Sequence, residues 1–210
     1  MEKKRSTGIV LQTRFPVKRV VIVLDSALGK IEVVPAKSTL ENMVRGFLVS
    51  YQLEEWRSLW IAHATEIAAI PAEWIKQDII FMHQLLEVCL VYSPFNQAAP
   101  LLFEILNLIY SDLTIIQETC IRENWRKKIL LCKLLALLGL YPDASVVSSQ
   151  MKINDLVGLP VETIFSLHYP TEYITLELDD DLTKWLKSAL QLTQEHKQLK
   201  TFSFGSVTNE

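Results

Sequence analysis

The sequence predicts an α+β protein of two domains, a small N-terminal barrel followed by a mainly helical domain. From Gly8 to about Ile70 the chain consists of short segments rich in Val, Ile, Leu and aromatic residues, which is typical of strands. After Pro71 the apolar residues recur at intervals of three and four, which is typical of helices. We therefore expect domains at residues 1–72 and 73–210.

The N-terminal region contains five expected strands. They read GIVLQTR, KRVVIVLD, KIEVVPA, GFLVSYQLEEW and SLWIAHATEI. The connections are short and turn-like, except for a longer link from Ser38 to Arg45 between the third and fourth strands. Five strands in about seventy residues, with one longer connection at this point, fit a closed barrel of the oligonucleotide-binding (OB) fold. An SH3-like barrel or an unspecialised small sheet has much the same pattern, so these alternatives stay open.

Four helical regions are expected after the strands. They cover Trp74–Tyr92, Ala98–Tyr110, about Leu113 to Leu138, and Leu182–Gln198. Gly139 and Pro142 are expected to end the third region, because glycine stops a helix readily and proline cannot continue it. The acidic run Asp179–Asp181 is expected to lie at the N-terminal end of the last helix, where free backbone N–H groups favour negative charge.

The net charge of −3 conceals an asymmetry along the chain. Residues 1–45 contain nine Lys and Arg against four acidic residues, whereas the remainder contains twelve against twenty. This asymmetry suggests two functional regions, of which the first suits a polyanion. Chance variation among solvent-facing strand residues explains the same pattern, so charge alone does not decide.

The composition excludes several classes of protein. Half of the residues are hydrophobic, which is ample for a buried core. No apolar run reaches the roughly eighteen uncharged residues of a membrane-spanning helix, and even Ile129–Leu140 contains Lys133. The first residues lack the apolar segment of an export signal, so we expect a cytoplasmic protein with no membrane partner. Cys89, Cys120 and Cys132 are expected to be reduced thiols in the core.

The sequence contains no recognisable catalytic or metal-binding motif. There is no glycine-rich phosphate loop and no dinucleotide-binding fingerprint. The four histidines are scattered, without a second ligand at metal-binding spacing. We therefore expect no cofactor, no metal and no enzymatic activity, although a catalytic triad assembled from distant positions stays open.

Several segments resemble the RecO family of bacterial recombination mediators. GIVLQTRFPVKRVVIVLDSALGKIEVVPAK is similar to the family's opening, in which a Gly-Ile-Val-Leu strand leads to a second strand and then to a Gly-Lys-Ile turn. KILLCKLLALLGLYPD resembles its Leu-Leu-Ala-Leu-Leu-Gly-Tyr-x-Pro-Asp segment. HQLLEVCLVYSPFNQAAPLLFEILNLI resembles its paired helices, and EHKQLKTFSF resembles its C-terminal segment. The matches occur in the family's order and span nearly the whole chain.

The resemblance implies an OB barrel that binds single-stranded and duplex DNA, followed by a helical domain, in a protein of recombinational repair. Members of the family anneal complementary strands and act with RecR to load RecA onto DNA covered by single-strand-binding protein, without hydrolysing nucleotides. Their helical domain takes up the acidic, hydrophobic C-terminal tail of single-strand-binding protein, and an apolar groove with a few cations suits such a ligand. The alternative is a non-enzymatic protein-interaction module that does not contact DNA.

Basic residues on or beside the predicted strand ends are the candidates for contacting phosphates, and an aromatic residue at the first turn is the candidate for stacking on a base. These nucleic-acid-binding candidates are Arg14, Phe15, Lys18, Arg19, Lys30, Lys37 and Arg45. Phe15 equally suits the role of a hydrophobic cover for the turn. The partner-binding candidates form the densest basic cluster elsewhere and comprise Arg122, Arg126, Lys127 and Lys128. A solvated helix face explains this cluster as well.

Two features depart from the family pattern. Many relatives carry four zinc-binding cysteines after the Pro-Asp segment, whereas ASVVSSQMKINDLVGLPVETIFSL contains none, so no zinc site is expected. Local packing is expected there instead, by Met151, Ile153, Leu156, Val157 and Leu159. The loop AKSTLENMVR retains only Lys37 and Arg45 as basic residues. DNA affinity is therefore expected to be modest and to fall strongly with salt.

Overall fold

The computed structural model describes residues 4–37, 39–72, 78–111, 124–142, 150–166 and 176–191, together with residues 199 and 202. The chain divides into two compact units, Met1–Ile116 and Gln117–Glu210. The predicted order of a five-stranded barrel followed by helices is confirmed. The expected boundary at residue 72 lies where strands give way to helices, and the first compact unit extends beyond it to include two helices. Within the described ranges, no helix is long and apolar enough to cross a membrane.

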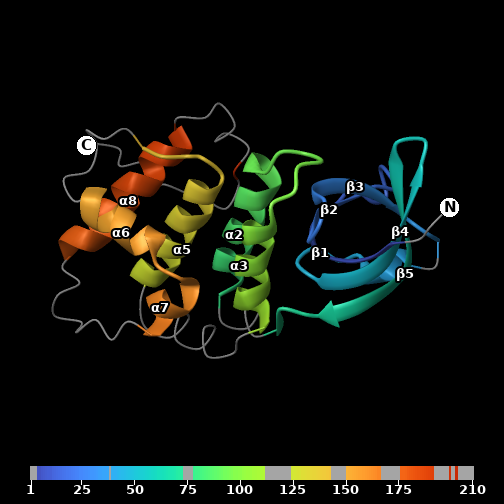
Figure 1. The fold of residues 1–210 in the computed structure, drawn as a ribbon, viewed down its shortest axis with the longest axis horizontal. Coiled ribbons are helices and arrows are strands. Elements are labelled where there is room, and N and C mark those ends of the chain that lie inside the picture. Colours follow the sequence, from blue (N-terminus) through green and yellow to red (C-terminus); the bar gives the residue numbers. More distant parts are fainter. Residues whose placement is uncertain are drawn as a thin grey trace. The chain divides into compact units, whose positions relative to one another are not determined.

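All five predicted strands are present, and they close into a barrel, drawn from blue to teal in Figure 1. They are β1 (Lys4–Thr13), β2 (Val21–Asp25), β3 (Gly29–Pro35), β4 (Leu48–Trp56) and β5 (Leu59–Ala69). The strands are hydrogen-bonded in the order β1-β2-β3-β5-β4, and β4 pairs back to β1. β3 and β5 run parallel, whereas the other four pairings are antiparallel. A closed barrel of five strands with this crossover has the architecture of the OB fold.

Inward-facing side chains from the strands fill the barrel. The core includes Val10, Val23, Ile31, Val49 and Tyr51. Most of these residues are β-branched, and such side chains pack well on a pleated, half-buried surface. A single turn of 3-10 helix, η1 (Leu40–Asn42), lies in the long connection between β3 and β4 and ends beside the buried Met43. The longer link that the sequence predicts at this point therefore contains a short helical turn.

Asp25, at the end of β2, is a fully buried carboxylate. Its Oδ2 accepts hydrogen bonds from Ser6 Oγ at 2.6 Å and from Tyr51 Oη at 2.7 Å. Its Oδ1 accepts from the backbone N–H groups of Ala27 at 2.8 Å and Leu28 at 2.9 Å. These four donors stabilise a charge whose burial is otherwise costly. Burial and the Asp25 charge raise the pKa of Tyr51 well above 10.0, so its hydroxyl keeps the proton that it donates.

In the part of the first unit that the structure describes, two helices, α2 and α3, follow the barrel. α2 spans Ile79–Tyr92 and contacts β1, and α3 spans Pro100–Ser111. Asp78 caps α2, because its carboxylate accepts a hydrogen bond from the backbone N–H of Phe81 at 2.9 Å. The predicted start of this helix at Trp74 lies outside the described residues. The barrel and α2 therefore belong to the same compact unit.

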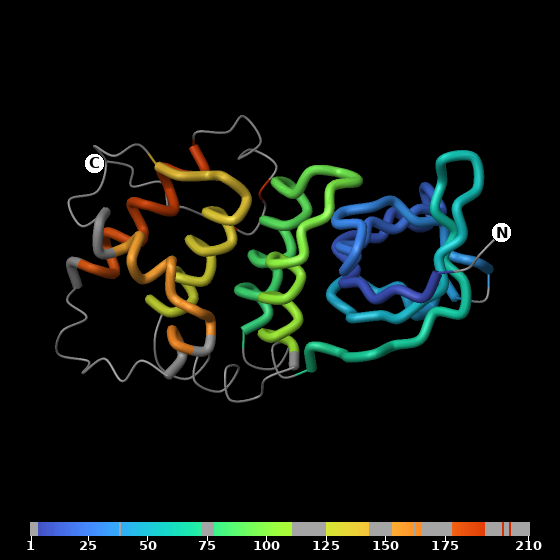
Figure 2. Tube along the Cα trace, viewed as in Figure 1, coloured from blue at the N-terminus to red at the C-terminus, as the bar shows by residue number. Residues whose placement is uncertain are grey.

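The second unit is built around α5 (Asn124–Leu137), which contacts α6 (Gln150–Gly158), α7 (Val161–Ser166) and α8 (Leu176–Gln191), shown from yellow to red in Figure 2. Its fully buried side chains include Leu130, Leu134, Ile164, Trp185 and Leu190. The packing predicted for the segment without zinc ligands is confirmed for Ile153, Leu156 and Val157, which are buried in α6. Leu159 is half-buried, and the side chain of Met151 lies outside the described residues.

Gly139 ends α5 in the predicted way. Its φ of +77° is a left-handed conformation that glycine adopts without strain. The backbone N–H of Leu140 donates to Leu135 O at 2.9 Å, and that of Gly139 donates to Ala136 O at 3.0 Å. These two bonds form a Schellman motif, which satisfies carbonyl groups that a helix end leaves free.

The prediction for the acidic run Asp179–Asp181 is wrong. α8 begins at Leu176, so the three aspartates lie within the helix rather than before it. Two of them contact lysines: Lys128 Nζ lies 2.6 Å from Asp179 Oδ2, and Lys184 Nζ lies 3.5 Å from Asp181 Oδ1. Ion pairing therefore accounts for Asp179 and Asp181, while Asp180 is exposed to solvent.

Cys89 and Cys132 are free thiols at fully buried positions, as predicted, while Cys120 lies outside the described residues. Burial raises the pKa of Cys89 to about 12, and the nearby charge of Lys30 opposes this effect. Burial also raises the pKa of Cys132. Both thiols are therefore protonated at neutral pH and behave as small hydrophobic residues.

Candidate nucleic-acid interface

The connection between β1 and β2, residues 14–20, is here called the β1–β2 loop. Two backbone hydrogen bonds shape it. The N–H of Arg14 donates to Val20 O at 3.1 Å, and the N–H of Lys18 donates to Arg14 O at 2.9 Å. The first bond continues the pairing of β1 with β2, and the second folds the loop into a turn. The loop is therefore a defined structure at the end of the barrel strands.

The side chains of the β1–β2 loop face solvent. Phe15 is 59% exposed and Val17 is 88% exposed. Lys18 and Arg19 are exposed as well. The loop therefore presents an aromatic ring and two cations where a nucleic acid can reach them.

Arg14 links the β1–β2 loop to β3. Its Nη1 lies 3.2 Å from Glu32 Oε1, and both side chains are partly exposed. An ion pair in such a setting contributes little stability but restricts the orientation of both groups. Arg14 is thereby held on the outer surface of the barrel.

The β4–β5 hairpin, residues 56–59, places a second aromatic ring beside a cation. Arg57 and Ser58 form its turn, with φ of +49° and +65°, as in the two-residue turns that match strand twist. The guanidinium carbon of Arg57 lies 4.7 Å from the centre of the Trp56 ring, and Trp56 is 47% exposed. Neither residue is among the sequence candidates. Their signal in the sequence is an aromatic and a basic residue side by side at a strand end.

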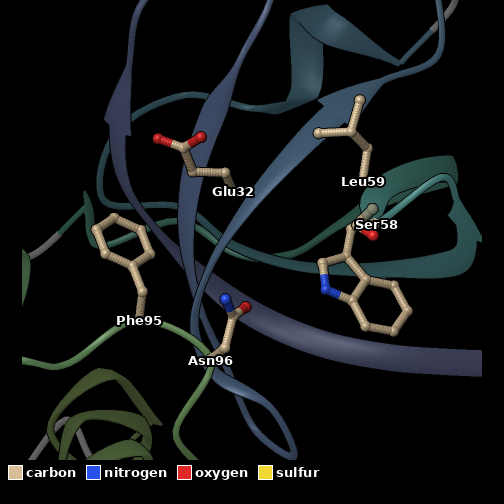
Figure 3. Close-up of a pocket in the computed structure, with 6 residues that line it drawn as sticks. Glu32, Ser58, Leu59, Phe95 and Asn96 are labelled. Carbon is tan, nitrogen blue, oxygen red and sulfur yellow. The ribbon is translucent and has the colours of Figure 1, made fainter.

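A pocket of about 350 Å³, here called the Glu32 pocket, lies between β3, the β4–β5 hairpin and the segment after α2. It is lined by Glu32, Ser58, Leu59, Trp60, Phe95 and Asn96. Figure 3 shows Phe95 and Glu32 on one side of the pocket, Leu59 on the other and Asn96 at its lower edge. Glu32 is also the partner of Arg14, so the pocket and the β1–β2 loop share one surface of the barrel.

Lys30 differs from its expected role as a phosphate contact. Its side chain is buried, with only 4% of the residue exposed. Its Nζ donates a hydrogen bond to Leu90 O at 2.8 Å, in the last turn of α2, where free carbonyl groups favour a cation. The same ammonium lies 4.3 Å from the centre of the Phe95 ring. Lys30 therefore attaches α2 to the barrel, and it is withdrawn from the phosphate-contacting candidates.

Arg45 and Lys37, the two cations of the long connection, have different environments. Lys37 is exposed. Arg45 is only partly exposed, and its Nε and Nη2 atoms are buried without a hydrogen-bond partner among the described residues. Burial and the Arg45 charge lower the pKa of His83 in α2, so this imidazole is neutral at pH 7. Arg45 thus faces the interior of the first unit, which leaves Lys37 as the better-placed phosphate contact.

The partner-binding candidates that the structure describes lie near the start of α5. Lys128 pairs with Asp179, and the guanidinium carbon of Arg126 lies 5.2 Å from the centre of the Trp125 ring. Lys127 is partly exposed. Arg122 lies outside the described residues. These cations therefore stabilise the second unit as well as giving it a basic surface.

Comparison with other proteins adds no family assignment. No protein-family model matches the chain, and no curated protein matches it. In the described ranges, no group of three or more His, Cys, Asp or Glu residues could hold a metal ion. The functional interpretation therefore depends on the geometry of the barrel surface and on the sequence itself.

Proposed function

We infer that this chain binds single-stranded DNA through the β1–β2 loop, the β4–β5 hairpin and the Glu32 pocket. The observation that carries this inference is the pairing of exposed aromatic rings with cations on one OB barrel. Phe15 stands beside Lys18 and Arg19 in the loop, and Trp56 lies against Arg57 in the hairpin.

This combination matches the chemistry of a single strand. Its phosphates attract Lys and Arg, while its unpaired bases expose faces that stack on aromatic rings. In OB folds, the first loop and the β4–β5 loop are the ones that commonly hold oligonucleotides. Both loops of this barrel present the required side chains, which favours a single strand over a partner recognised by apolar contacts alone.

The affinity expected from these residues is modest. Lys30 and Arg45 are directed to the interior, so the remaining candidate cations are Arg14, Lys18, Arg19 and Lys37, together with Arg57 of the hairpin. Each phosphate contact on a single strand contributes about 0.7 to the slope of log K against log salt. Binding is therefore expected at low salt and is expected to weaken steeply as salt rises.

The proposal extends to a role in DNA repair as a recombination mediator. The resemblance to the RecO family supports annealing of complementary strands, binding of duplex DNA, and loading of a recombinase onto DNA covered by single-strand-binding protein. RecR and the C-terminal tail of single-strand-binding protein are the corresponding protein partners. The exposed parts of Arg126 and Lys127 at the start of α5 are the candidates for the acidic tail.

Fluorescence anisotropy of a labelled single-stranded oligonucleotide, at low and near-physiological salt, tests the proposal. The double variant Lys18→Ala/Arg19→Ala is expected to bind more weakly at low salt and to lower the salt slope by about 1.4, because two phosphate contacts are lost. The matched control, Lys184→Ala/Lys187→Ala, removes the same charge from α8 and is expected to bind like the parent. Circular dichroism checks that each variant is folded.

Two outcomes would overturn the proposal. The first is a parent protein that does not bind at low salt, which favours the alternative of a protein-interaction module. The second is a folded Lys18→Ala/Arg19→Ala variant with unchanged affinity and salt slope. If binding is confirmed, a strand-annealing assay with fluorophore-labelled complementary strands tests the mediator role, and loss of annealing in the same variant is expected.

A further inference from the structure

The Glu32 pocket combines aromatic walls with a carboxylate, and this combination specifies its occupant more closely than DNA binding in general. Its volume of about 350 Å³ lies near the lower end for ligand pockets, which suits one base rather than an extended ligand. The pocket is open to the same barrel surface as the β1–β2 loop, because Arg14 of that loop contacts Glu32. A base of a strand bound there can therefore reach it.

The Phe95 ring forms one wall of the pocket, and contacts with Lys30 and β3 hold it in position. Lys30 Nζ lies 4.3 Å from the centre of the ring, and Leu90 O fixes the ammonium at 2.8 Å. The N–H of Asn96 donates to Lys30 O at 2.8 Å, which attaches the backbone next to the ring to β3. Because the ammonium covers one face of the ring, a stacked base must use the other. A ring fixed in this way loses little conformational entropy when a base stacks on it.

The polar side chains of the pocket determine which hydrogen-bonding groups a ligand must present. A carboxylate only accepts hydrogen bonds, so Glu32 repels phosphate and attracts a ligand that offers N–H donors. Arg14 Nη1 lies 3.2 Å from its Oε1, and a carboxylate has room for further donors. Asn96 and Ser58 at the rim can both donate and accept. The pocket is therefore suited to the edge of a base rather than to the backbone.

We propose that the Glu32 pocket binds a guanine base of the single strand, which stacks on Phe95 and donates its N1–H and its 2-amino group to the Glu32 carboxylate. Guanine is the DNA base whose Watson–Crick edge presents two adjacent donors, as a carboxylate requires for bidentate contact. Adenine and cytosine offer one exocyclic amino group next to an acceptor, and thymine offers one imino N–H between two acceptors. This inference rests on the proposed single-strand binding and adds a base preference to it.

Binding of three labelled oligonucleotides tests the inference without any variant. The first is oligo(dT), the second carries one central guanine, and the third carries hypoxanthine at that position, which lacks only the 2-amino group. The guanine strand is expected to bind about tenfold more tightly than oligo(dT), within the range of a bidentate base contact. The hypoxanthine strand is expected to lose most of this gain.

Variants then assign the preference to the pocket. Glu32→Gln is expected to abolish the preference for guanine over thymine, because an amide replaces one acceptor by a donor and so cannot accept both N–H groups of the base. Glu41→Gln changes an exposed carboxylate of η1 in the same way and is expected to keep the preference. Phe95→Leu is expected to weaken binding of the guanine strand more than that of oligo(dT).

The outcomes separate this inference from the proposed function. Equal binding of all three strands overturns the guanine site and leaves single-strand binding intact. A guanine preference that survives Glu32→Gln also overturns it, because the base is then recognised elsewhere. Absence of binding to every strand overturns both the site and the proposed function.

Discussion

The β1–β2 loop and the start of β3 are close in sequence and each contains a lysine, yet the two lysines have opposite environments. Lys18 in the loop is exposed. Lys30 is buried, bonded to Leu90 O of α2 and stacked on Phe95. Lys18 is therefore accessible from solvent, whereas Lys30 attaches α2 to the barrel.

This difference shows how the basic residues of one region divide into exposed cations and cations that support the fold. A buried ammonium is retained only if partners compensate for its lost hydration. The carbonyl end of α2 and the face of an aromatic ring supply such partners. The net positive charge of the N-terminal region therefore overstates the charge that is free to meet phosphates.

A substitution that disturbs the backbone next to Lys30 is expected to have the largest effect on stability. Gly29 precedes Lys30 and has a φ of +76°, and a methyl group there would collide with the carbonyl of Gln97. Because backbone atoms cannot move aside cheaply, Gly29→Ala is expected to lower the free energy of unfolding by about 3 kcal/mol or more. Urea unfolding followed by circular dichroism measures the change.

Gly139→Ala is the matched control for Gly29→Ala. Its φ of +77° is nearly the same, but nothing lies within 4 Å of the added methyl group. Only the left-handed conformation is then penalised, at a cost of about 1 kcal/mol. Equal losses in the two variants would show that the contact with Gln97 does not matter.

Replacing each lysine by methionine tests the difference between Lys18 and Lys30 directly. Lys30→Met keeps an unbranched side chain only one atom shorter but removes the bond to Leu90 O and the contact with Phe95, so a stability loss of about 2 kcal/mol is expected. Its DNA affinity, measured on folded protein, is expected to stay the same for oligo(dT). Lys18→Met is expected to leave stability unchanged and to lower the salt slope of binding by about 0.7.

The opposite result would contradict the assignment of Lys30 to fold stability and of Lys18 to DNA binding. A Lys30→Met variant that unfolds like the parent but binds oligo(dT) more weakly would return Lys30 to the phosphate-contacting residues. Both measurements use the same two proteins, so stability and affinity are compared in one series.

The strands of the barrel could be predicted from the sequence because β-branched and aromatic residues cluster in short runs, such as KIEVVPA. The end of α5 could be predicted because Gly139 is a residue type with a specific backbone role. The start of α8 could not, because the acidic run Asp179–Asp181 imitates the first turn of a helix although it lies inside one. Local signals thus suffice only where one residue type has one dominant use.

The candidate site was less predictable because exposure depends on tertiary contacts. Lys30 and Lys18 are equivalent on charge alone, and only the position of α2 separates them. Phe95 follows a helix far along the chain from β3, so the sequence does not show that it lines a pocket with Glu32. The lysine, the ring and the carboxylate meet through packing of the first unit.

Alkaline pH tests the interior beside Lys30. Burial raises the pKa of Cys89 from 9.0 to about 12, so the folded state keeps this proton at pH values where the unfolded chain has lost it. Stability is then fully present below pH 9.0 and falls as pH rises through 9.0 towards 12. This group alone is expected to lower the free energy of unfolding by about 1.4 kcal/mol at pH 10.

Cys89→Ala isolates that contribution. Between pH 8 and pH 10 the stability of the parent is expected to fall by about 1.4 kcal/mol more than that of the variant, because the variant has no thiol to titrate. Between pH 6 and pH 8 the difference between the two proteins is expected to be constant. Parallel curves across the whole range would contradict a buried, protonated thiol at this position.

Lys128 provides the intermediate case and the smallest expected effect. Its Nζ lies 2.6 Å from Asp179 Oδ2, with side-chain exposures of 23% for the lysine and 40% for the aspartate. Since water screens such a pair, Lys128→Met is expected to lower the free energy of unfolding by only about 0.5 kcal/mol. A double-mutant cycle with Asp179→Asn measures the pair itself. A coupling as large as the loss in Lys30→Met would mean that burial does not separate supporting lysines from the rest.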